Sequence, residues 1–430
     1  MPQRKYNKTK IESTKHTKRI TLPIDLAGYN ELLHDKQTFR HGLNEMIQNY
    51  PELFPCDINQ GYKLHGMMPA SQKMPHAQLR RIQLTARDPA GKRQLFTIAP
   101  CDILPYMTGE VTQVEKALFL RRFGVPFWAL TYIFGHNDMY WYRIVGNLGR
   151  HDIVGTTVKE PKNLPEHLLA DEKHAHFNGE KVYIATTVAQ DCVLGASVSF
   201  TADAQGLIEA YGYFQQEAHG LDANYAPLTV NTDGWLATHL AWQQLFASVT
   251  IIQCFLHAFL KVRTCGKRLG STFTEIKSQV WDIYRATSRP DFRHKIGQLQ
   301  AWTRSHADQL TNPVIEAIDK LCAKADSFML TFDYPEAHRT SNMVDRHMEP
   351  MARWLYSTRY FHGHYLSAEL HTRSWALLHN FWPYCPRAKV HETYQSPAHK
   401  LNGFVYRDNW LENLLVSTSL HGFHVSNKKR

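Results

Sequence analysis

This chain of 430 residues lacks the paired cysteines of a disulfide-rich or zinc-ribbon protein. Its seven cysteines are an odd number, and no two of them form a CxxC pair. A secreted disulfide protein carries a dense and even cysteine framework, so this pattern predicts reduced thiols and a cytoplasmic location. Cys56, His65, His76 and Cys101 lack the tight spacing of zinc ligands, which argues against a structural metal among them.

Long hydrophobic runs are missing as well. The most apolar stretch, residues 245–260, is too short and too interrupted to span a bilayer. The first nineteen residues hold seven Lys or Arg and one Glu without an apolar segment, so we expect neither a secretory signal nor a membrane partner. A glycine-rich phosphate loop of the Walker kind is also absent, and we therefore expect no nucleotide cofactor.

What the chain has is an excess of positive charge, with a formal net charge of +10 and a pI near 9.1. Such a balance favours an anionic partner, and nucleic acid is the first candidate. The length suggests two or three domains. Residues 1–20 read as a basic arm that either contacts phosphates or is a solvated tail, and residues 21–112 as a small N-terminal module of mixed structure.

Three short helical patterns separated by glycines occupy residues 113–150. VEKALFLRRF ends near Gly124, PFWALTYIF begins with a proline, and NDMYWYRIVGN follows Gly135 with an Asn or Asp cap. This outline is typical of a helix-turn-helix DNA-binding module, and an ordinary three-helix packing unit is the alternative. The candidate DNA contacts are the basic residues Lys116, Arg121, Arg122, Arg143 and Arg150.

Residues 151–257 change to three strands, a helix, a strand, a helix and a strand. EHLLADEKHAHF and EKVYIATTVAQ are joined by Asn178 and Gly179, a dipeptide that favours a tight hairpin. Asp171 lies on the first strand, and Asp233 ends the fourth strand in LTVNTDGW. In this strand order the two strands lie side by side, so we expect the two acids to meet.

A third acid, Asp345 in RTSNMVDRHMEP, lies on a later helix. Glu349 is one turn further along the same face and is the alternative, although Pro350 directly after it disturbs the helix there. Each acid taken singly has an ordinary explanation as a turn or surface residue. The remaining segments are an all-helical insertion at 258–335, the rest of the α/β core at 336–385, and a C-terminal tail at 386–430.

Three carboxylates that converge on one point can hold divalent cations. Mg²⁺, or Mn²⁺, binds through carboxylate oxygens and keeps several waters. Two such ions catalyse in-line displacement at a phosphodiester, because one activates a water or terminal hydroxyl and the other stabilises the leaving oxygen. We therefore predict Asp171, Asp233 and Asp345 as catalytic residues and as ligands of two ions.

These residues resemble the DDE transposases of prokaryotic insertion sequences, in the clade related to eukaryotic Mutator elements. That signature has an acid on strand one, an acid ending strand four, a Cys-x-x-His, a helical insertion and a last acid after a Ser-Asn pair. Cys254 and His257 in QCFLH match the Cys-x-x-His, and TSNMVD matches the end. The family's last acid is commonly glutamate, whereas here it is aspartate. The resemblance covers about residues 150–385.

The resemblance implies that Cys254 and His257 are a site element beside the acids. A buried cysteine with a satisfied histidine is the alternative, and zinc is not expected because no second ligand pair lies nearby. It implies an α/β fold with a ribonuclease H-like mixed sheet, β-β-β-α-β-α-β-α, with an all-helical insertion, preceded by a helix-turn-helix module and a small N-terminal mixed module. The two segments of the core are 151–257 and 336–385.

As a function, the resemblance implies a transposase that binds double-stranded DNA at element ends, cuts a phosphodiester and joins the freed 3′-OH to target DNA. Such an enzyme works as a homo-oligomer in a prokaryotic cytoplasm, at the nucleoid when bound to DNA. The alternatives are an inactive transposase-derived DNA-binding protein and a ribonuclease H-like nuclease without strand transfer.

Overall fold

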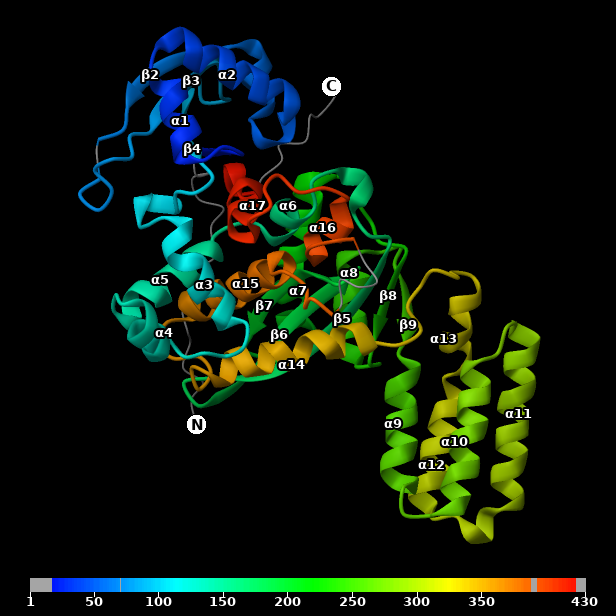
Figure 1. Cartoon of the computed structure of the whole chain (residues 1–430). Helices are drawn as coiled ribbons and strands as arrows, with labels where there is room; N and C mark the ends of the chain where they lie inside the picture. Colours follow the sequence, from blue (N-terminus) through cyan, green and yellow to red (C-terminus); the bar gives the residue numbers. More distant parts are fainter. Residues whose placement is uncertain (1–17, 70, 388–392, 423–430) are drawn as a thin grey trace.

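A computed structural model describes residues 18–69, 71–387 and 393–422. They form a mixed α/β protein with two mixed sheets, of four and five strands, and many helices. Figure 1 shows the smaller sheet at one end, the larger sheet with its covering helices in the middle, and a helical bundle that extends from one side. Most of the predicted basic arm lies outside the described residues, and the first strand begins at Arg19.

The first module contains β1 (Arg19–Leu22), α1 (Leu26–Leu33), α2 (Lys36–Asn49), β2 (Tyr62–Met67), β3 (Arg80–Arg87) and β4 (Arg93–Pro100). Its sheet has the order β1-β4-β3-β2, in which β1 runs parallel to β4 and the other pairs are antiparallel. Aspartates begin both helices, because the Asp25 and Asp35 carboxylates accept hydrogen bonds from free backbone N–H groups of the first turn.

Three helices then follow: α3 (Val111–Arg121), α4 (Phe127–Phe134) and α5 (Asp138–Leu148). Gly124 and Gly135 adopt positive φ angles of 76° and 74°. Gly135 is the C-cap of α4, whereas α3 ends at Arg121, three residues before Gly124. Asn137 caps α5 by accepting a hydrogen bond from the Tyr140 N–H at 2.8 Å. The three helical patterns expected within residues 113–150 are therefore helices in the structure.

The larger sheet and its helices comprise β5 (His167–Phe177), β6 (Glu180–Ala189), β7 (Cys192–Ser199), α7 (Ala204–Leu221), β8 (Thr229–Thr232), α8 (Leu236–Leu245) and β9 (Thr250–Gln253). The sheet order is β7-β6-β5-β8-β9. β5, β6 and β7 are antiparallel neighbours, whereas β8 runs parallel to both β5 and β9. At the β5–β6 turn, Asn178 and Gly179 both have positive φ, as a tight hairpin requires.

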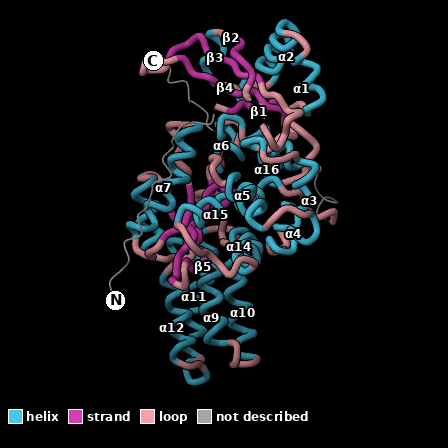
Figure 2. Tube along the Cα trace, turned by 90° about the vertical axis from the view of Figure 1, so that its left-hand side faces the viewer, coloured by secondary structure: helices cyan, strands magenta, loops and turns pink. Residues whose placement is uncertain are grey.

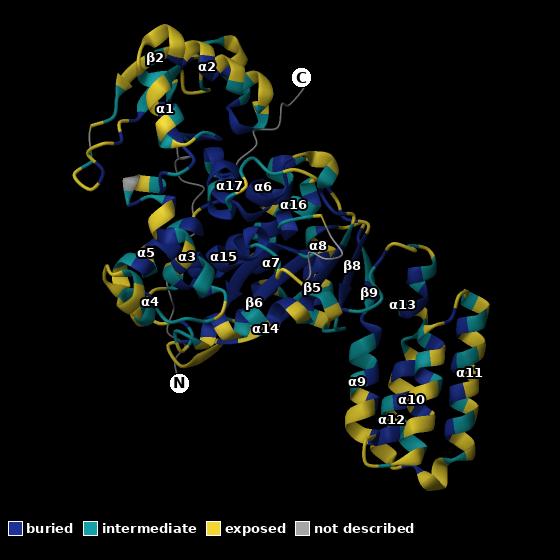
Figure 3. Cartoon of the chain, viewed as in Figure 1, coloured by how far each residue is buried: buried dark blue, intermediate teal, exposed yellow. Residues whose placement is uncertain are grey.

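The chain leaves β9 into a bundle of α9 (Phe255–Gly266), α10 (Ser271–Tyr284), α11 (Arg289–Ser305), α12 (Asn312–Ala323) and α13 (Ala325–Met329). The bundle has a hydrophobic core of its own, built around residues such as Phe259, Val280 and Ile318. Figure 2 shows the long helices side by side below the larger sheet, and Figure 3 shows that their outer faces are exposed. Residues 258–335 are thus helical, as predicted.

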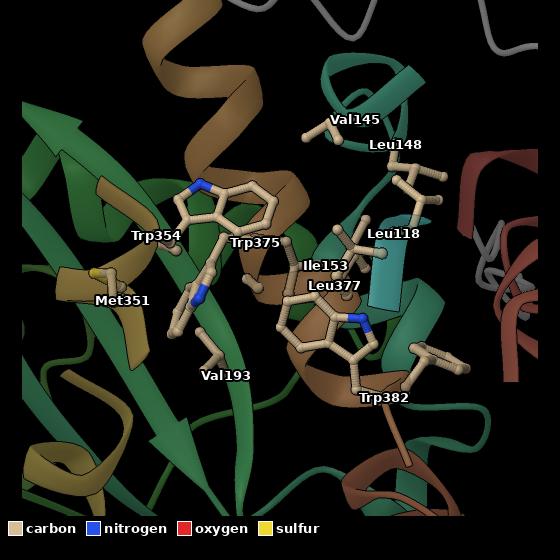
Figure 4. Close-up of a cluster of buried hydrophobic side chains, with 14 of the residues drawn as sticks. Leu118, Val145, Leu148, Ile153, Val193, Met351, Trp354, Trp375, Leu377 and Trp382 are labelled. Carbon is tan, nitrogen blue, oxygen red and sulfur yellow. The ribbon is translucent and has the colours of Figure 1, made fainter. Parts of the chain in front are cut away.

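The last helices return to the larger sheet: α14 (Asn342–Tyr356), α15 (Tyr365–Phe381), α16 (Pro397–Asn402) and α17 (Trp410–Ser417). α7 and α8 cover one face of the sheet, and α14 and α15 cover the other face. Figure 4 shows Trp375 and Trp382 in the core between α15, the sheet and the helices around Leu118 and Leu148.

The C-terminal segment, which the sequence suggested to be a tail, is well packed where the structure describes it. Trp410 and Leu411 lie in the core of the larger sheet. Val416 and Leu420 complete the core of the N-terminal module. α17 therefore joins the two ends of the chain. Among the described residues, no helix combines the length and apolar character that a membrane crossing requires.

Candidate catalytic site

Two of the three predicted acids lie on neighbouring parallel strands. β5 and β8 pair with His167 opposite Thr229 and Leu169 opposite Asn231. Continuing this register by two residues sets Asp171 opposite Asp233. Asp233 follows the last residue of β8, and its carboxylate accepts a hydrogen bond from the Trp235 N–H at 2.8 Å. The turn role considered for Asp233 is therefore real, and it also holds the carboxylate at the sheet edge.

Because side chains alternate along β5, Asp171 lies on the face of the sheet that α14, the helix of Asp345, covers. Leu168 and Ala170 pack on the α7 face, whereas Leu169 packs on the opposite face with residues of α14. Asp171 shares the Leu169 face, because side chains two apart on a strand point the same way. Asp345 lies in the first turn of α14, which packs on β5. Thus β5 and α14 bring these two acids together.

The three carboxylates are close enough to affect one another. Burial, and then the negative charges of Asp233 and Asp345, raise the pKa of Asp171 from 3.8 to about 6. A hydrogen bond from the Glu172 N–H at 2.8 Å and the positive charge of His257 oppose this rise. Asp171 therefore lies within electrostatic range of two other carboxylates and of the positive charge of His257.

Ser341 connects the predicted Cys-His pair to the third acid. Its N–H donates to the Cys254 sulfur at 3.1 Å, and its hydroxyl donates to Asp345 Oδ2 at 3.3 Å. The same hydroxyl lies 3.2 Å from His257 Nδ1 and 3.3 Å from the Cys254 sulfur. In the sequence, Ser341 stands out only as part of the Ser-Asn pair. Its position four residues before Asp345 was the available signal.

The pair formed by Cys254 and His257 is strongly polarised. The hydrogen bond with Cys254 raises the pKa of His257 to about 9 despite burial, and the charges of Asp171 and Asp345 act in the same direction. Burial raises the pKa of Cys254, but hydrogen bonds from His257 and Ser341 outweigh it and lower the pKa overall. Cys254 is only 2% exposed, so it is not presented to a substrate as a nucleophile.

Glu172 directly follows Asp171 on β5. It points to the α7 face, where Tyr211 and Thr238 each donate a hydrogen bond of 2.7 Å to its Oε1. Burial raises the pKa of Glu172 to about 7. Thr238 lies on α8, the helix that follows the Asp233 turn. The hydrogen bond from Thr238 to Glu172 therefore links β5, the strand of Asp171, to the helix that follows Asp233.

Glu349, the alternative third acid, lies away from this cluster. Its side chain is 68% exposed and accepts a hydrogen bond of 2.5 Å from Arg353. It is not among the charges that shift the pKa of Asp171. Pro350 does not end the helix, since α14 continues to Tyr356.

The chemistry of this donor set fits a hard divalent cation. Three carboxylates supply oxygen ligands, and a cation would offset both the burial of the Asp171 charge and the repulsion from Asp233 and Asp345, which together raise the pKa of Asp171. Within the described ranges, however, no three His, Cys, Asp or Glu side chains are arranged as ligands of a single ion. The carboxylates lie within electrostatic range of one another without forming one ligand set.

The five predicted DNA contacts separate into two groups. Lys116, Arg143 and Arg150 are exposed. Arg121 is fully buried, and its guanidinium donates to the Val125 carbonyl at 2.5 Å and to Ser357 Oγ at 2.9 Å. It also lies over the rings of Phe127 and Trp354, at 4.4 and 4.3 Å from their centroids.

The prediction that Arg121 contacts DNA is therefore wrong, because its charged group is enclosed by protein. Burial lowers its pKa to about 9, so it still carries its charge at neutral pH. Arg122 is half-buried and donates to the Pro383 carbonyl at 2.7 Å beside the Trp382 ring. Both arginines thus connect the end of α3 to the ends of α14 and α15. Three of the five residues remain accessible to a phosphate.

Comparison with known proteins adds no relative. No family model matches this chain, and no curated protein sequence is significantly similar to it.

Proposed function

We propose that this protein is a DDE-type transposase, a polynucleotidyl transferase with a ribonuclease H-like core. The observation that carries the proposal is that carboxylates from three separate elements lie within electrostatic range of one another around Asp171. The sheet order β7-β6-β5-β8-β9 supports it, because this order pairs the strand of Asp171 with the strand that Asp233 follows.

Asp171, Asp233 and Asp345 would hold Mg²⁺ or Mn²⁺ in this proposal. Two such ions would supply an activated water or 3′-OH and would stabilise the leaving oxygen of the phosphodiester. The ionised form of Asp171 is needed to bind a cation, so its raised pKa makes cation binding weaken below about pH 6.

His257 would place a positive charge beside the acids. Because its pKa is raised to about 9, the imidazole carries both protons at neutral pH. Its Nδ1 then donates to Ser341 Oγ, which in turn donates to Asp345. His257 would thereby orient Asp345 and attract the phosphate of a DNA strand, while buried Cys254 keeps the imidazole charged.

The helical insertion contributes cations to the same edge of the sheet. Lys324 lies beside the Asp233 turn, since a Cβ added to Gly234 would be 3.0 Å from its Nζ. Burial, and then the charge of Lys261, lower the pKa of Lys324, whereas Asp233 raises it. Lys261, Arg263, Lys267 and Arg268 are exposed on α9 and after it. We propose that these groups guide the DNA backbone to the acids.

A DNA-processing assay distinguishes this proposal from its alternatives. The purified chain is incubated with Mg²⁺ and with labelled DNA that carries the sequences flanking its own reading frame. Joined products support the transposase. Cleavage without joining supports a nuclease, and binding alone supports an inactive DNA-binding derivative. Asp171→Asn, Asp233→Asn and Asp345→Asn should each abolish product, whereas Glu349→Gln, the matched control on α14, should leave it unchanged.

A homo-oligomer is part of the proposal, because two element ends must be held together during joining. Sedimentation of the chain with and without end DNA tests it. A DNA-bound complex that contains two or more chains is expected, and an active complex with a single chain contradicts this part of the proposal.

A further inference from the structure

A cavity away from the three acids lies between the N-terminal module and the residues that follow α5 and α17. Its volume is about 470 Å³, which is within the range of small-molecule sites. Met68, Leu79 and Tyr106 supply apolar surface, and Lys18, Arg19 and Arg150 supply positive charge. Among the residues that the structure describes, no carboxylate lines the cavity. An apolar space with cations and no acid selects an organic anion.

One ring nitrogen of His151, a residue that lines this cavity, has no hydrogen-bond partner among the described residues. His151 is 6% exposed, and this nitrogen is its buried Nδ1. Burial, and then the positive charges of His421, Arg19, Arg373 and Arg150, lower the pKa of His151. The neutral imidazole therefore offers one hydrogen bond to a ligand in a region of positive potential.

Tyr106 and Arg19 are neighbours in the wall of the cavity and offer different chemistry. The Tyr106 ring is 59% exposed, and its backbone is held at a φ of 63° in a short turn. An exposed ring can stack on a planar group. The Arg19 guanidinium is anchored by the Ile103 and Leu104 carbonyls, at 2.5 and 3.1 Å, so its charge is fixed in place.

We propose that this cavity binds a nucleotide unit, with its phosphate at Lys18 and Arg150 and its base against Tyr106. Arginine and lysine suit a phosphate, and an apolar wall with a few polar side chains, among them the His151 imidazole, suits a base. Arg150 comes directly after Gly149, the residue that ends α5, so the cavity opens beside the three-helix module. The unit is either a free nucleoside monophosphate or one nucleotide of a DNA strand, and in the second case the inference rests on the proposed function.

Isothermal titration calorimetry of the full chain without Mg²⁺ tests whether the cavity binds a nucleotide unit, whichever of the two sources supplies it. Deoxyadenosine monophosphate should bind at least about tenfold more tightly than deoxyadenosine or inorganic phosphate, because only the whole unit contacts both the cations and the Tyr106 ring. Lys18→Gln with Arg150→Gln, and separately Tyr106→Ala, should weaken binding by about tenfold or more. Lys320→Gln and Tyr132→Ala are matched exposed controls outside the cavity and should change nothing.

A DNA strand that carries 2-aminopurine separates the two sources. If DNA supplies the nucleotide, the fluorescence change on binding is lost in Tyr106→Ala. If the free nucleotide is the ligand, the monophosphate binds while DNA binding is unaffected by the cavity variants. Each of these results supports the cavity as a nucleotide site. Absence of both signals, or equal effects in cavity and control variants, would overturn the proposal.

These readouts do not depend on DNA cleavage. Asp171→Asn should bind the monophosphate as the unaltered chain does. The inference and the proposed function can therefore fail separately.

Discussion

Replacing Asp171 by asparagine should stabilise the folded protein at neutral pH although it removes the central carboxylate. Burial, and then the charges of Asp233 and Asp345, raise the pKa of Asp171 from 3.8 to about 6. The folded state therefore holds this proton more tightly than the unfolded state does. The free energy of unfolding therefore falls as the pH rises from about 4 to about 6. Above that range the ionised carboxylate destabilises the folded state by its full amount.

The magnitude follows from the two pKa values. A difference of about 2 corresponds to about 3 kcal/mol, and partial access of solvent reduces this to about 1 to 3 kcal/mol. Asparagine keeps an oxygen that can accept the hydrogen bond from the Glu172 N–H, which lies 2.8 Å away. The substitution thus removes the charge and retains the contact.

Urea unfolding of both proteins without divalent ions, at several pH values, measures the effect. Asp171→Asn should be more stable at about pH 8 and should have no advantage at about pH 4. Mg²⁺ should stabilise the unaltered chain and not the variant, since a cation that binds only the folded state shifts the equilibrium. A variant that is equally or less stable at about pH 8 would refute the reasoning. Glu349→Gln serves as the exposed control.

Three further substitutions test other parts of the structure. Cys254→Ala should lower the pKa of His257 from about 9 by more than about 1, because the hydrogen bond with Cys254 is the largest cause of its rise; an unchanged NMR titration of the imidazole would contradict the polarised pair. Arg121→Ala should destabilise the protein by about 3 kcal/mol through the loss of buried hydrogen bonds and ring contacts, whereas exposed Arg143→Ala should change stability by less than about 0.5 kcal/mol; equal unfolding midpoints would contradict the role given to Arg121. Glu172→Ala should cost about 2 to 4 kcal/mol, because two buried hydroxyls lose their acceptor; a loss below about 1 kcal/mol in urea unfolding would show that they find other partners.

Local chemistry explains which parts of the fold were predictable. The hairpin at Asn178 and Gly179 depends on two residues that tolerate positive φ, and both adopt it. Asp171 and Asp233 could be paired because the order of elements makes their strands neighbours. The helices of residues 258–335 were predictable because apolar residues recur at helical spacing in each of them.

Other features depend on contacts between residues far apart in the chain. Arg121 looks like a surface cation on its own helix, and only the packing of α14 against α3 encloses it with Ser357 and Trp354. Val416 and Leu420 complete the core of the N-terminal module, whose first strand begins at Arg19. No local sequence pattern predicts a contact between residues so far apart in the chain.

The central claim is that Asp171, Asp233 and Asp345 jointly bind divalent cations. Electron paramagnetic resonance of Mn²⁺ titrated into the full chain measures this directly, because free and bound Mn²⁺ give different signals. Each Asp→Asn substitution at these three positions should weaken binding by about tenfold or more, and Glu349→Gln should leave it unchanged. Mn²⁺ binding that survives all three substitutions, or that depends on Glu349, would contradict the account.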